Sequence, residues 1–451
     1  MKELCVTSFP NNALPMPISC HHMQSFPLYQ TLFPLLAGVA QGVKALHPQI
    51  AAFFEVRQHL FTTLQQQLAT MPNNGFRLWV HAASVGEFEQ ARPIIAALQA
   101  RHPNLRLFIS FLSPSGYNAR KNFPNAAAVF YLPLDTAANA RKLVALLKPD
   151  ALLLMRYDFW PNHLLAAKKY GTTLVLAAAV LQPQSAYFNP LLRRFYKKLF
   201  HLFNAIYTVA ERDTQAFKEH FGYRNAITAG DPRFDQVVAR SRNRAAVANL
   251  RAHYEGRKVL VAGSVWEADE QLLIAAWQEL NPRPSLIVVP HQTEPEKIAH
   301  LCSLLDERNL SYARISTFPE SFQPEQQILI IDQIGYLAEL YSIASIAYVG
   351  GGFGVNVHNT LEPAVYAIPV LFGPNHHNSP EAAALLEAGG ATVVQQQSEL
   401  HAALQCLCSN ESERQRQGSA AGTFVQARTG ATAMVVEYLE GVANVVKWQG
   451  S

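Results

Sequence analysis

Residues 346–363, IAYVGGGFGVNVHNTLEP, contain the pattern that decides the fold. Ile346–Val349 is a short apolar run, which predicts a buried strand. Four glycines follow within five positions, and a helix is expected to begin near Asn359. In open α/β sheets, such turns between a strand and a helix carry the ligand site. The segment therefore predicts both a doubly wound sheet and one of its functional loops.

The same rhythm of strand, turn and helix runs through most of the chain. Short aliphatic runs alternate with longer amphipathic segments, which predicts parallel strands joined by helices. The strands expected in the first half are Leu78–Ala82, Leu105–Phe111, Ala128–Tyr131, Ala151–Met155, Thr173–Ala178 and Ala205–Thr208. Those expected in the second half are Lys258–Ala262, Leu286–Val289, Ile328–Ile331, Ile346–Val349, Pro369–Phe372 and Ala391–Val394. Their nearly continuous hydrophobicity is typical of sheets covered by helices on both faces.

Two domains are expected for 451 residues, because a single core rarely grows beyond about 250–300 residues. The rhythm breaks at Gly230–Arg233, GDPR, and restarts near Lys258. We therefore predict an α/β protein with two Rossmann-like doubly wound lobes and a ligand cleft between them. The predicted regions are a disordered tail (1–25), an anchor region (26–70), a first lobe (71–235) and a second lobe (236–451). The last helix, around Ala433–Tyr438, is expected to return to the first lobe.

Charge and cysteine content exclude several classes of protein. A net charge of +4 is too weak for a nucleic-acid-binding protein but suits anionic lipids or substrates. The five cysteines form no C-x-x-C pair, so we expect reduced thiols and no zinc site. They are Cys5, Cys20, Cys302, Cys406 and Cys408. The chain also lacks D-x-D, Walker A and G-x-S-x-G sequences, so no metal is predicted.

The N-terminal region suggests attachment to a membrane. Residues 1–25 have no apolar period and no signal-peptide pattern, so disorder is expected, and Met23 is an alternative start. The next segment, Pro27–Leu46, is nearly long enough to span a bilayer but is interrupted by polar residues and a proline. We therefore predict a helix that lies in the membrane interface. The alternative is a soluble amphipathic helix that closes the first lobe.

The turn after the first expected strand reads His81-Ala-Ala-Ser84-Val-Gly86-Glu87. Gly86 allows a close backbone approach, and Glu87 opens a helix that faces the cleft. Ser84 and Glu87 are also spaced as a capping box, in which both side chains bind amides of the first turn. Spacing alone does not decide whether Glu87 is catalytic or only caps the helix. The same ambiguity recurs at Ser264-Val-Trp-Glu267 and Asn359-Thr-Leu-Glu362.

The glycine-rich loop predicts an anion site. Free amides in such a loop and at a helix N-terminus suit a nucleotide phosphate, and Glu362 is placed to accept hydrogen bonds from ribose hydroxyls. The loop differs from the G-x-G-x-x-G fingerprint and lies in the second half, which argues against an NAD enzyme. The candidate residues of this loop are Gly351, Gly352, His358, Asn359 and Glu362.

Two further segments are candidates for contact with a second substrate. Arg156 and Asp158 end a strand, where they are suited to an anion and an acceptor hydroxyl; a helix cap beside a packed Trp160 is an equally good interpretation. The helix PLLRRFYKKLF carries Arg193, Arg194, Lys197 and Lys198 among aromatic residues. Such a helix suits phosphorylated lipid, although an ordinary solvated helix face has the same pattern.

The ordered motifs resemble those of the transferases of Kdo, 3-deoxy-D-manno-octulosonic acid. The segments that carry the resemblance are HAASVGE, LLMRYDFWPN, GDPRFD, GSVWEADE, VPH and GGGFGVNVHNTLEPAVYAIPVLFGPN. The resemblance covers roughly Pro27 to the C-terminus, and the order and spacing of these motifs match the family. The resemblance implies the GT-B glycosyltransferase architecture, an acceptor-binding first lobe and a second lobe that binds the CMP-sugar.

The resemblance further implies transfer of Kdo from CMP-Kdo to a lipid A precursor (lipid IVA) with inversion, in lipopolysaccharide core biosynthesis. The enzyme would work without metal or cofactor on the cytoplasmic face of the bacterial inner membrane. The family's catalytic base falls on Glu87. Its CMP-binding positions fall on Gly263, Ser264, Gly352, Asn359 and Glu362, and less specifically on Arg233 and His291. We add Gly351 and His358 from the glycine-rich loop, and Ser84, Gly86, Arg156, Asp158, Arg193, Arg194 and Lys197 on the acceptor side.

Some positions depart from the family pattern. Many members have an acidic residue in place of Arg156, an arginine in place of His291 and a glutamate in place of Asp158. These departures concern the acceptor more than the donor. The alternatives are another GT-B nucleotide-sugar transferase, a nucleotide-sugar epimerase, which should lack the anchor and the basic helix, and an inactive lipid-binding scaffold.

Overall fold

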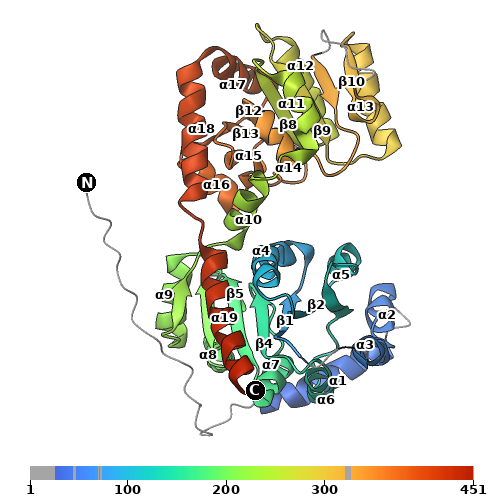
Figure 1. The fold of residues 1–451 in the computed structure, drawn as a ribbon, viewed down its shortest axis with the longest axis vertical. Helices are drawn as coiled ribbons and strands as arrows, with labels where there is room; N and C mark the ends of the chain where they lie inside the picture. The colour runs from blue at the N-terminus through green and yellow to red at the C-terminus, as the bar shows by residue number, and fades with distance from the viewer. Residues whose placement is uncertain (1–25, 44–46, 70, 72–73, 320–326, 450–451) are drawn as a thin grey trace, which may run out of the picture.

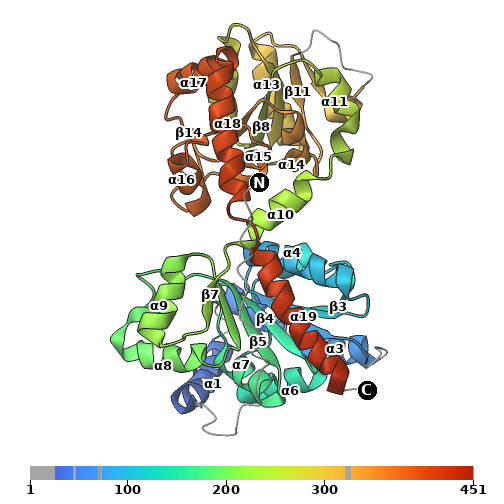
Figure 2. The ribbon, with the colours of Figure 1, turned by 60° about the vertical axis from the view of Figure 1, so that its left-hand side comes forward.

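The computed structural model describes residues 26–43, 47–69, 71, 74–319 and 327–449. The disorder expected for residues 1–25, with Cys5, Cys20 and the alternative start Met23, lies outside the described residues. Two lobes, each built on one parallel sheet, lie one above the other along the long axis (Figures 1 and 2). The predicted pair of Rossmann-like lobes is therefore confirmed.

The first lobe contains a seven-stranded parallel sheet in the order β3-β2-β1-β4-β5-β6-β7. Its strands are β1 Arg77–Ala82, β2 Arg106–Phe111, β3 Ala126–Tyr131, β4 Ala151–Met155, β5 Thr173–Ala179, β6 Ala205–Thr208 and β7 Ala226–Thr228. Alternate residues of β4 enter different cores: Leu152 and Leu154 lie in one, and Leu153 and Met155 in the other. Both faces of the sheet are thus buried, which explains why its strands are apolar throughout.

The second lobe repeats this arrangement with the order β10-β11-β9-β8-β12-β13-β14. Its strands are β8 Val259–Val265, β9 Ser285–Pro290, β10 Tyr312–Arg314, β11 Ile328–Ile330, β12 Ile346–Val349, β13 Val370–Phe372 and β14 Ala391–Val393. All twelve predicted strands are present. The two that sequence analysis missed, β7 and β10, are three-residue edge strands.

Strand order determines where each lobe can bind a ligand. In the first sheet β1 and β4 are neighbours, but the chain leaves them toward opposite edges. In the second sheet β8 and β12 have the same relation. The loops after such strands diverge and leave a crevice at the carboxyl ends. The predicted site residues follow these four strands: Glu87 follows β1, Arg156 follows β4, Ser264 lies at the end of β8, and the glycine-rich loop follows β12.

Helices cover both sheets. Those up to the lobe junction are α1 Pro27–Gly42, α2 Pro48–Glu55, α3 Leu60–Ala69, α4 Val85–Arg101, α5 Pro114–Arg120, α6 Ala137–Leu147, α7 Pro161–Tyr170, α8 Pro190–Phe200, α9 Glu211–Phe221 and α10 Pro232–Ser241. The others are α11 Ala248–Tyr254, α12 Glu267–Gln278, α13 Pro295–Glu307, α14 Leu337–Leu340, α15 Leu361–Ala364, α16 Pro380–Glu387, α17 Gln397–Ser409, α18 Glu411–Gln426 and α19 Ala431–Gln449.

The chain passes between the lobes twice. It first crosses at α10, and it returns between α18 and α19, so that Val436 and Leu439 of α19 pack in the first lobe as expected (Figures 1 and 2). The two crossings are joined because Asp235 of α10 accepts hydrogen bonds from the amides of Gly430 and Thr432, both at 2.7 Å.

The predicted anchor segment forms α1, which ends at Gly42. The outer face of α1 is apolar and exposed, with Leu35, Leu36 and Val39 each more than 60% accessible. Among the described helices, none has the length and apolar character needed to span a bilayer.

Candidate functional site

The turn between β1 and α4 holds Glu87 in a nearly buried position. Ser84 caps the helix, since its Oγ accepts a hydrogen bond from the Glu87 amide at 3.4 Å. The Glu87 carboxylate does not complete the reciprocal box, because its Oε2 binds the amide of Ala83 at 2.7 Å instead of that of Ser84. Among the described residues, Oε1 has no hydrogen-bond partner. One carboxylate oxygen of Glu87 is thus held by the backbone, and the other is available to accept a proton.

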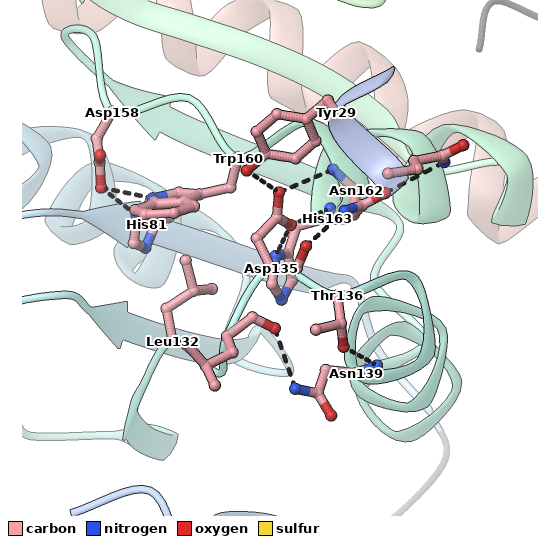
Figure 3. A network of polar contacts seen from close by, with 12 residues as sticks. Tyr29, His81, Leu132, Asp135, Thr136, Asn139, Asp158, Trp160, Asn162 and His163 are labelled. Carbon is pink, nitrogen blue, oxygen red and sulfur yellow. Dashed lines mark hydrogen bonds and ion pairs between the residues drawn. The ribbon is translucent and has the colours of Figure 1, made fainter. Parts of the chain in front are cut away.

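A chain of polar side chains links this turn to the end of β4. His81 Nε2 lies 2.9 Å from Asp158 Oδ2, and Trp160 Nε1 donates to the same oxygen at 2.9 Å (Figure 3). On the other side of the imidazole, Nδ1 of His81 lies 2.8 Å from the hydroxyl of Ser110, which accepts a hydrogen bond from Trp79. Sequence analysis did not detect these contacts, because the residues come from strands β1 and β2 and from the loop after β4.

The two carboxylates are in opposite electrostatic environments. Burial raises the pKa of Glu87, and the negative charge of Asp158 adds to that rise, while the Ala83 amide, His81 and Arg156 oppose it. Burial also acts to raise the pKa of Asp158, but the hydrogen bonds from His81 and Trp160 outweigh it and hold the pKa below its ordinary value. A carboxylate of raised pKa beside one of lowered pKa is the pattern of an acid–base group with an ionised partner.

Two predicted site residues have strained backbones. Arg156 directly after β4 has φ = 60°, and Ser264 in β8 has φ = 53°. Neither is a glycine, so each conformation costs roughly 1–3 kcal/mol, and such strain concentrates at functional sites. Both positions lie at the switch point of their sheet, Arg156 directly after β4 and Ser264 near the end of β8, the counterpart of β1.

Tight packing explains the glycines of the loop after β12. A Cβ on Gly350 would lie 2.4 Å from the Ser264 carbonyl oxygen, and one on Gly352 would lie 2.6 Å from the backbone of Gly373. Gly351 has φ = 91°, and its amide donates to Asp269 Oδ2 at 2.8 Å. That amide is therefore engaged. Within the described loop, the amides of Gly352 and Phe353 are among those without a backbone or side-chain acceptor, so they are available to an anion.

The capping box predicted at Ser264 and Glu267 is wrong. The N-terminal cap of α12 is Trp266, and its amide binds the carboxylate of Asp269 at 3.0 Å. The positive φ of Ser264 moves the chain out of the geometry that a cap at this residue requires. At the third predicted box, the side chain of Asn359 accepts a hydrogen bond from the Leu361 amide at 3.1 Å.

Three rings from separate loops stack beside the glycine-rich loop. Centroid distances are 4.6 Å between Trp266 and His291 and 4.4 Å between His291 and His358. Trp266 Nε1 also donates to Nε2 of His358 at 3.0 Å. Burial lowers the pKa of both histidines, so the stack is uncharged at neutral pH.

Beside this stack lies a pocket of about 270 Å³. Its lining includes Trp266, Glu270, His291, Lys297 and Gly354. Glu270 is 4% exposed, and its Oε2 has no hydrogen-bond partner in the described part of the chain. Burial and the charges of Glu267 and Asp269 raise its pKa to about 7. Sequence analysis did not single out this carboxyl group, because its environment depends on the position of the loop after β9.

The remaining donor-side candidates are divided between two places. Glu362 lies 3.5 Å from Arg240, and its pKa is raised by burial and, against the effect of Arg240, by the charge of Glu89 on α4 of the other lobe. Arg233 lies in the lobe junction, where it pairs with Asp231 at 2.8 Å and Glu381 at 2.9 Å. An anion would have to compete with these two carboxylates for Arg233.

On the acceptor side, Arg193, Arg194, Lys197 and Lys198 are all exposed on α8. A Cβ on Gly86 would meet no atom within 4 Å, so the backbone there is open to a ligand. No group of three or more His, Cys, Asp or Glu side chains in the described part of the chain is suited to a metal ion.

The comparisons with known proteins agree on one family. Residues 54–236 match the family model of 3-deoxy-D-manno-octulosonic-acid transferase (kdotransferase). The 3-deoxy-D-manno-octulosonic acid transferase of Chlamydophila psittaci is 28% identical over 327 residues, 71% of this chain and 75% of that protein. The transferase of the same description from Aquifex aeolicus is 29% identical over 324 residues, 70% of this chain and 80% of that protein. Residues 54–236 are a Kdo transferase domain, and the family resemblance is confirmed.

Solved structures support the fold. UDP-GlcNAc 2-epimerase from Neisseria meningitidis, bound to UDP-GlcNAc, superposes with a TM-score of 0.55 over 80% of this chain and 99% of that chain, at 15% identity. A glycosyltransferase from Rickettsia africae gives a TM-score of 0.51 at 11% identity over 83% of this chain and 99% of that chain. At these identities the likeness establishes the two-lobe, GT-B-like fold of this chain, and nothing about its substrate.

Proposed function

We propose that the chain is a metal-independent glycosyltransferase that moves Kdo from CMP-Kdo onto a lipid A precursor in lipopolysaccharide biosynthesis. The observation that carries the proposal is the pair of carboxylates at the switch point of the first lobe. Glu87 has a raised pKa and a free oxygen, and Asp158 is held ionised by His81. The family relationship supports Kdo as the sugar, and the motif resemblance implies CMP as its leaving group.

In the proposed reaction, a primary hydroxyl of the acceptor attacks the anomeric carbon of Kdo in a single inverting displacement. The new bond joins the acceptor oxygen to that carbon, and the bond from the same carbon to the phosphate oxygen breaks. Glu87 takes the hydroxyl proton, and CMP leaves with the electron pair on its phosphate. Because Glu87 is largely desolvated, it is a stronger base than a carboxylate in water.

Asp158 serves in this mechanism as a fixed negative charge. Its hydrogen bonds to His81 and Trp160 keep it ionised and hold the imidazole beside Glu87. Since the charge of Asp158 raises the pKa of Glu87, it also strengthens the base. Asp158 and Arg156 together border the space next to Glu87 where an acceptor hydroxyl would be oriented.

On the donor side, we assign the CMP phosphate to the free amides of Gly352 and Phe353, which are suited to charge that builds up on the leaving group. Glu362 is placed one turn further for the ribose hydroxyls, and His291 and His358 offer an uncharged ring surface. Gly351 and Ser264 act through the backbone shape of the loops that they form.

The proposed site of action is the cytoplasmic face of the bacterial inner membrane. Its support is the exposed apolar face of α1 together with the exposed basic residues of α8. The two helices adjoin each other, because Phe26, directly before α1, packs on Phe195 of α8 with ring centroids 5.0 Å apart. An apolar stripe beside a cationic helix suits a surface of anionic lipid.

The test is to incubate the purified full chain with CMP-Kdo, generated in situ, and a tetraacylated lipid A precursor. The proposal predicts CMP release in proportion to acceptor and a lipid product heavier by whole Kdo units. Turnover of UDP-N-acetylglucosamine without any transfer to lipid would instead indicate an epimerase, the activity named for the structural neighbour from Neisseria meningitidis. Binding of CMP with no turnover of either substrate would indicate an inactive scaffold.

A further inference from the structure

An apolar pocket of about 470 Å³ lies between α1, α2 and the ends of strands β2 and β3. Phe33 and Ala37 of α1 form one wall, Phe53 of α2 forms another, and Leu132 after β3 and the ring of Trp160 contribute to the lining. Its size falls in the range of about 300–1,000 Å³ that is usual for ligand pockets. A pocket of this composition has few groups with which to bind a polar ligand.

Apart from the exposed Gln49, the polar side chains that line this pocket are already used by the protein. Asp135 is fully buried, and its carboxylate accepts hydrogen bonds from Tyr29 at 2.9 Å and from the amides of Asn162 and His163 at 3.1 and 2.9 Å, as well as contacting the His163 ring (Figure 3). Because every hydrogen bond that this carboxylate needs is supplied by the fold, the pocket makes no demand for a polar occupant.

The backbone at the pocket floor is satisfied in the same way. Arg57 Nε donates to the carbonyl of Leu132 at 2.8 Å, and its Nη2 donates to the carbonyl of Leu112 at 3.0 Å. These two carbonyls follow strands β3 and β2, whose ends form the floor. Arg57 therefore binds the groups that would otherwise require water, and the surface left over is hydrocarbon.

The pocket opens toward the apolar outer face of α1. Leu36 lines the pocket and is also 67% exposed, so it lies at the mouth. Its neighbours Leu35 and Val39 are 63% and 66% exposed and continue the same apolar surface outside. Hydrocarbon that covers the outside of α1 can thus enter the pocket along Leu36.

The pocket also adjoins the proposed acceptor site through one shared residue, Trp160. The ring of Trp160 lines the pocket, while its Nε1 donates to Asp158, which is linked to His81 in the Glu87 cluster. In Figure 3, Trp160 lies between the Asp158–His81 pair and the Asp135 cluster. On the other side, the basic helix α8 reaches α1 through Phe195, which packs on Tyr29 at 6.1 Å. The apolar pocket, the Glu87 cluster and the basic helix α8 therefore lie next to one another.

We propose that this pocket holds one fatty acyl chain of the acceptor lipid while its hydroxyl is presented to Glu87. The inference rests on the proposed function and adds to it, because it makes acylation of the acceptor a determinant of recognition. The acceptor's phosphates would then lie toward the cations of α8. Of the possible sources of hydrocarbon, the acceptor is favoured over bulk membrane lipid because the pocket wall is shared with the side chain that hydrogen-bonds to Asp158.

The test is to fill the pocket without changing the outer face of α1. Ala37→Trp places a large ring in the pocket, and Val39→Trp places the same ring on the exposed side of the same helix, where the residue does not line the pocket. The KM for the acylated acceptor in detergent should rise about tenfold or more in Ala37→Trp, the equivalent of roughly two lost methylene contacts. Val39→Trp should keep the wild-type KM, and the KM for CMP-Kdo should be unchanged in both variants.

Equal KM values in the two variants would overturn the proposal. So would a result in which Ala37→Trp weakens binding to phospholipid vesicles that contain no acceptor but leaves the KM in detergent unchanged, since the pocket would then hold membrane lipid.

A second measurement keeps this inference separate from the proposed function. A fatty acid that carries bromine near its methyl end should quench tryptophan fluorescence, and most of that quenching should disappear in Trp160→Phe. Acyl quenching without any Kdo transfer by the wild type would refute the proposed function alone. Kdo transfer without quenching would refute the acyl pocket alone.

Discussion

His81 Nε2 lies 2.9 Å from Asp158 Oδ2 and so joins the ends of β1 and β4 at the switch point of the first sheet. This contact determines the electrostatics of the site. It contributes to keeping Asp158 ionised although the residue is mostly buried, and the charge of Asp158 in turn raises the pKa of Glu87. The base and the group that tunes it are thus supplied by neighbouring strands rather than by neighbouring residues.

Replacement of Asp158 by Asn should move the pH profile. Glu87 must be ionised to accept a proton, so kcat rises with pH through its pKa. Since the charge of Asp158 raises that pKa, Asp158→Asn should shift the acidic limb of the kcat profile to lower pH and reduce the maximal rate. Asp332→Asn, at an ion pair with Arg314 in the other lobe, is the control and should leave the limb in place. An unshifted limb in Asp158→Asn would show that the two carboxylates are not coupled.

The raised pKa of Glu270 predicts that the stability of the second lobe depends on pH. Burial and the nearby Glu267 and Asp269 raise its pKa to about 7 against the opposing charge of Lys297. A carboxyl group whose pKa is higher in the folded than in the unfolded state favours folding when protonated, so stability falls as pH rises from about 4.5 to 7. Glu270→Gln removes that loss.

The free energy of unfolding of Glu270→Gln should therefore match the wild type near pH 4.5 and exceed it at pH 8. The upper limit of the difference is about 3 kcal/mol, from the size of the pKa shift. Denaturant unfolding at the two pH values measures it, with Glu307→Gln, whose side chain is exposed on α13 and does not act on Glu270, as the control. A difference that does not change with pH would contradict the assignment.

Gly351 and Gly354 test whether the glycine-rich loop depends on its backbone shape. Gly351 has φ = 91°, and a Cβ there would lie 2.1 Å from the carbonyl oxygen of Asn356. Gly351→Ala should therefore lower the free energy of unfolding by about 2 kcal/mol or more and weaken CMP binding. A Cβ on Gly354 would meet no atom within 4 Å, so Gly354→Ala should be close to wild type in unfolding. Equal effects of the two substitutions in thermal unfolding would refute this account of the loop.

Much of the fold could be predicted from the sequence because both sheets are buried on both faces. Strands such as Ala151–Met155 then appear as unbroken apolar runs, which periodicity detects. The missed strands Ala226–Thr228 and Tyr312–Arg314 are short and lie at sheet edges, where fewer residues are buried and the pattern is weak.

The site was predictable only where its residues are close in sequence. Glu87 and the glycine-rich loop stand out as motifs next to strand ends. His81, by contrast, is one more residue of an apolar strand until the fold brings Asp158 beside it. The capping box at Ser264 failed because its spacing is correct while the backbone there is left-handed. The use of the Gly351 amide by Asp269 likewise depends on a contact across 82 residues.

The most direct test of the central claim is the kcat for Kdo transfer of Glu87→Gln compared with the wild type. Gln can still accept the hydrogen bond from the Ala83 amide, so the fold and CMP affinity should be retained, while the proton acceptor is lost. Glu219→Gln, at an exposed glutamate on α9 of the same lobe, is the control. The account predicts a fall in kcat of roughly 10²–10⁴-fold for Glu87→Gln and little change for Glu219→Gln. A Glu87→Gln enzyme with the kcat of the wild type would show that Glu87 only shapes the turn and that the base lies elsewhere.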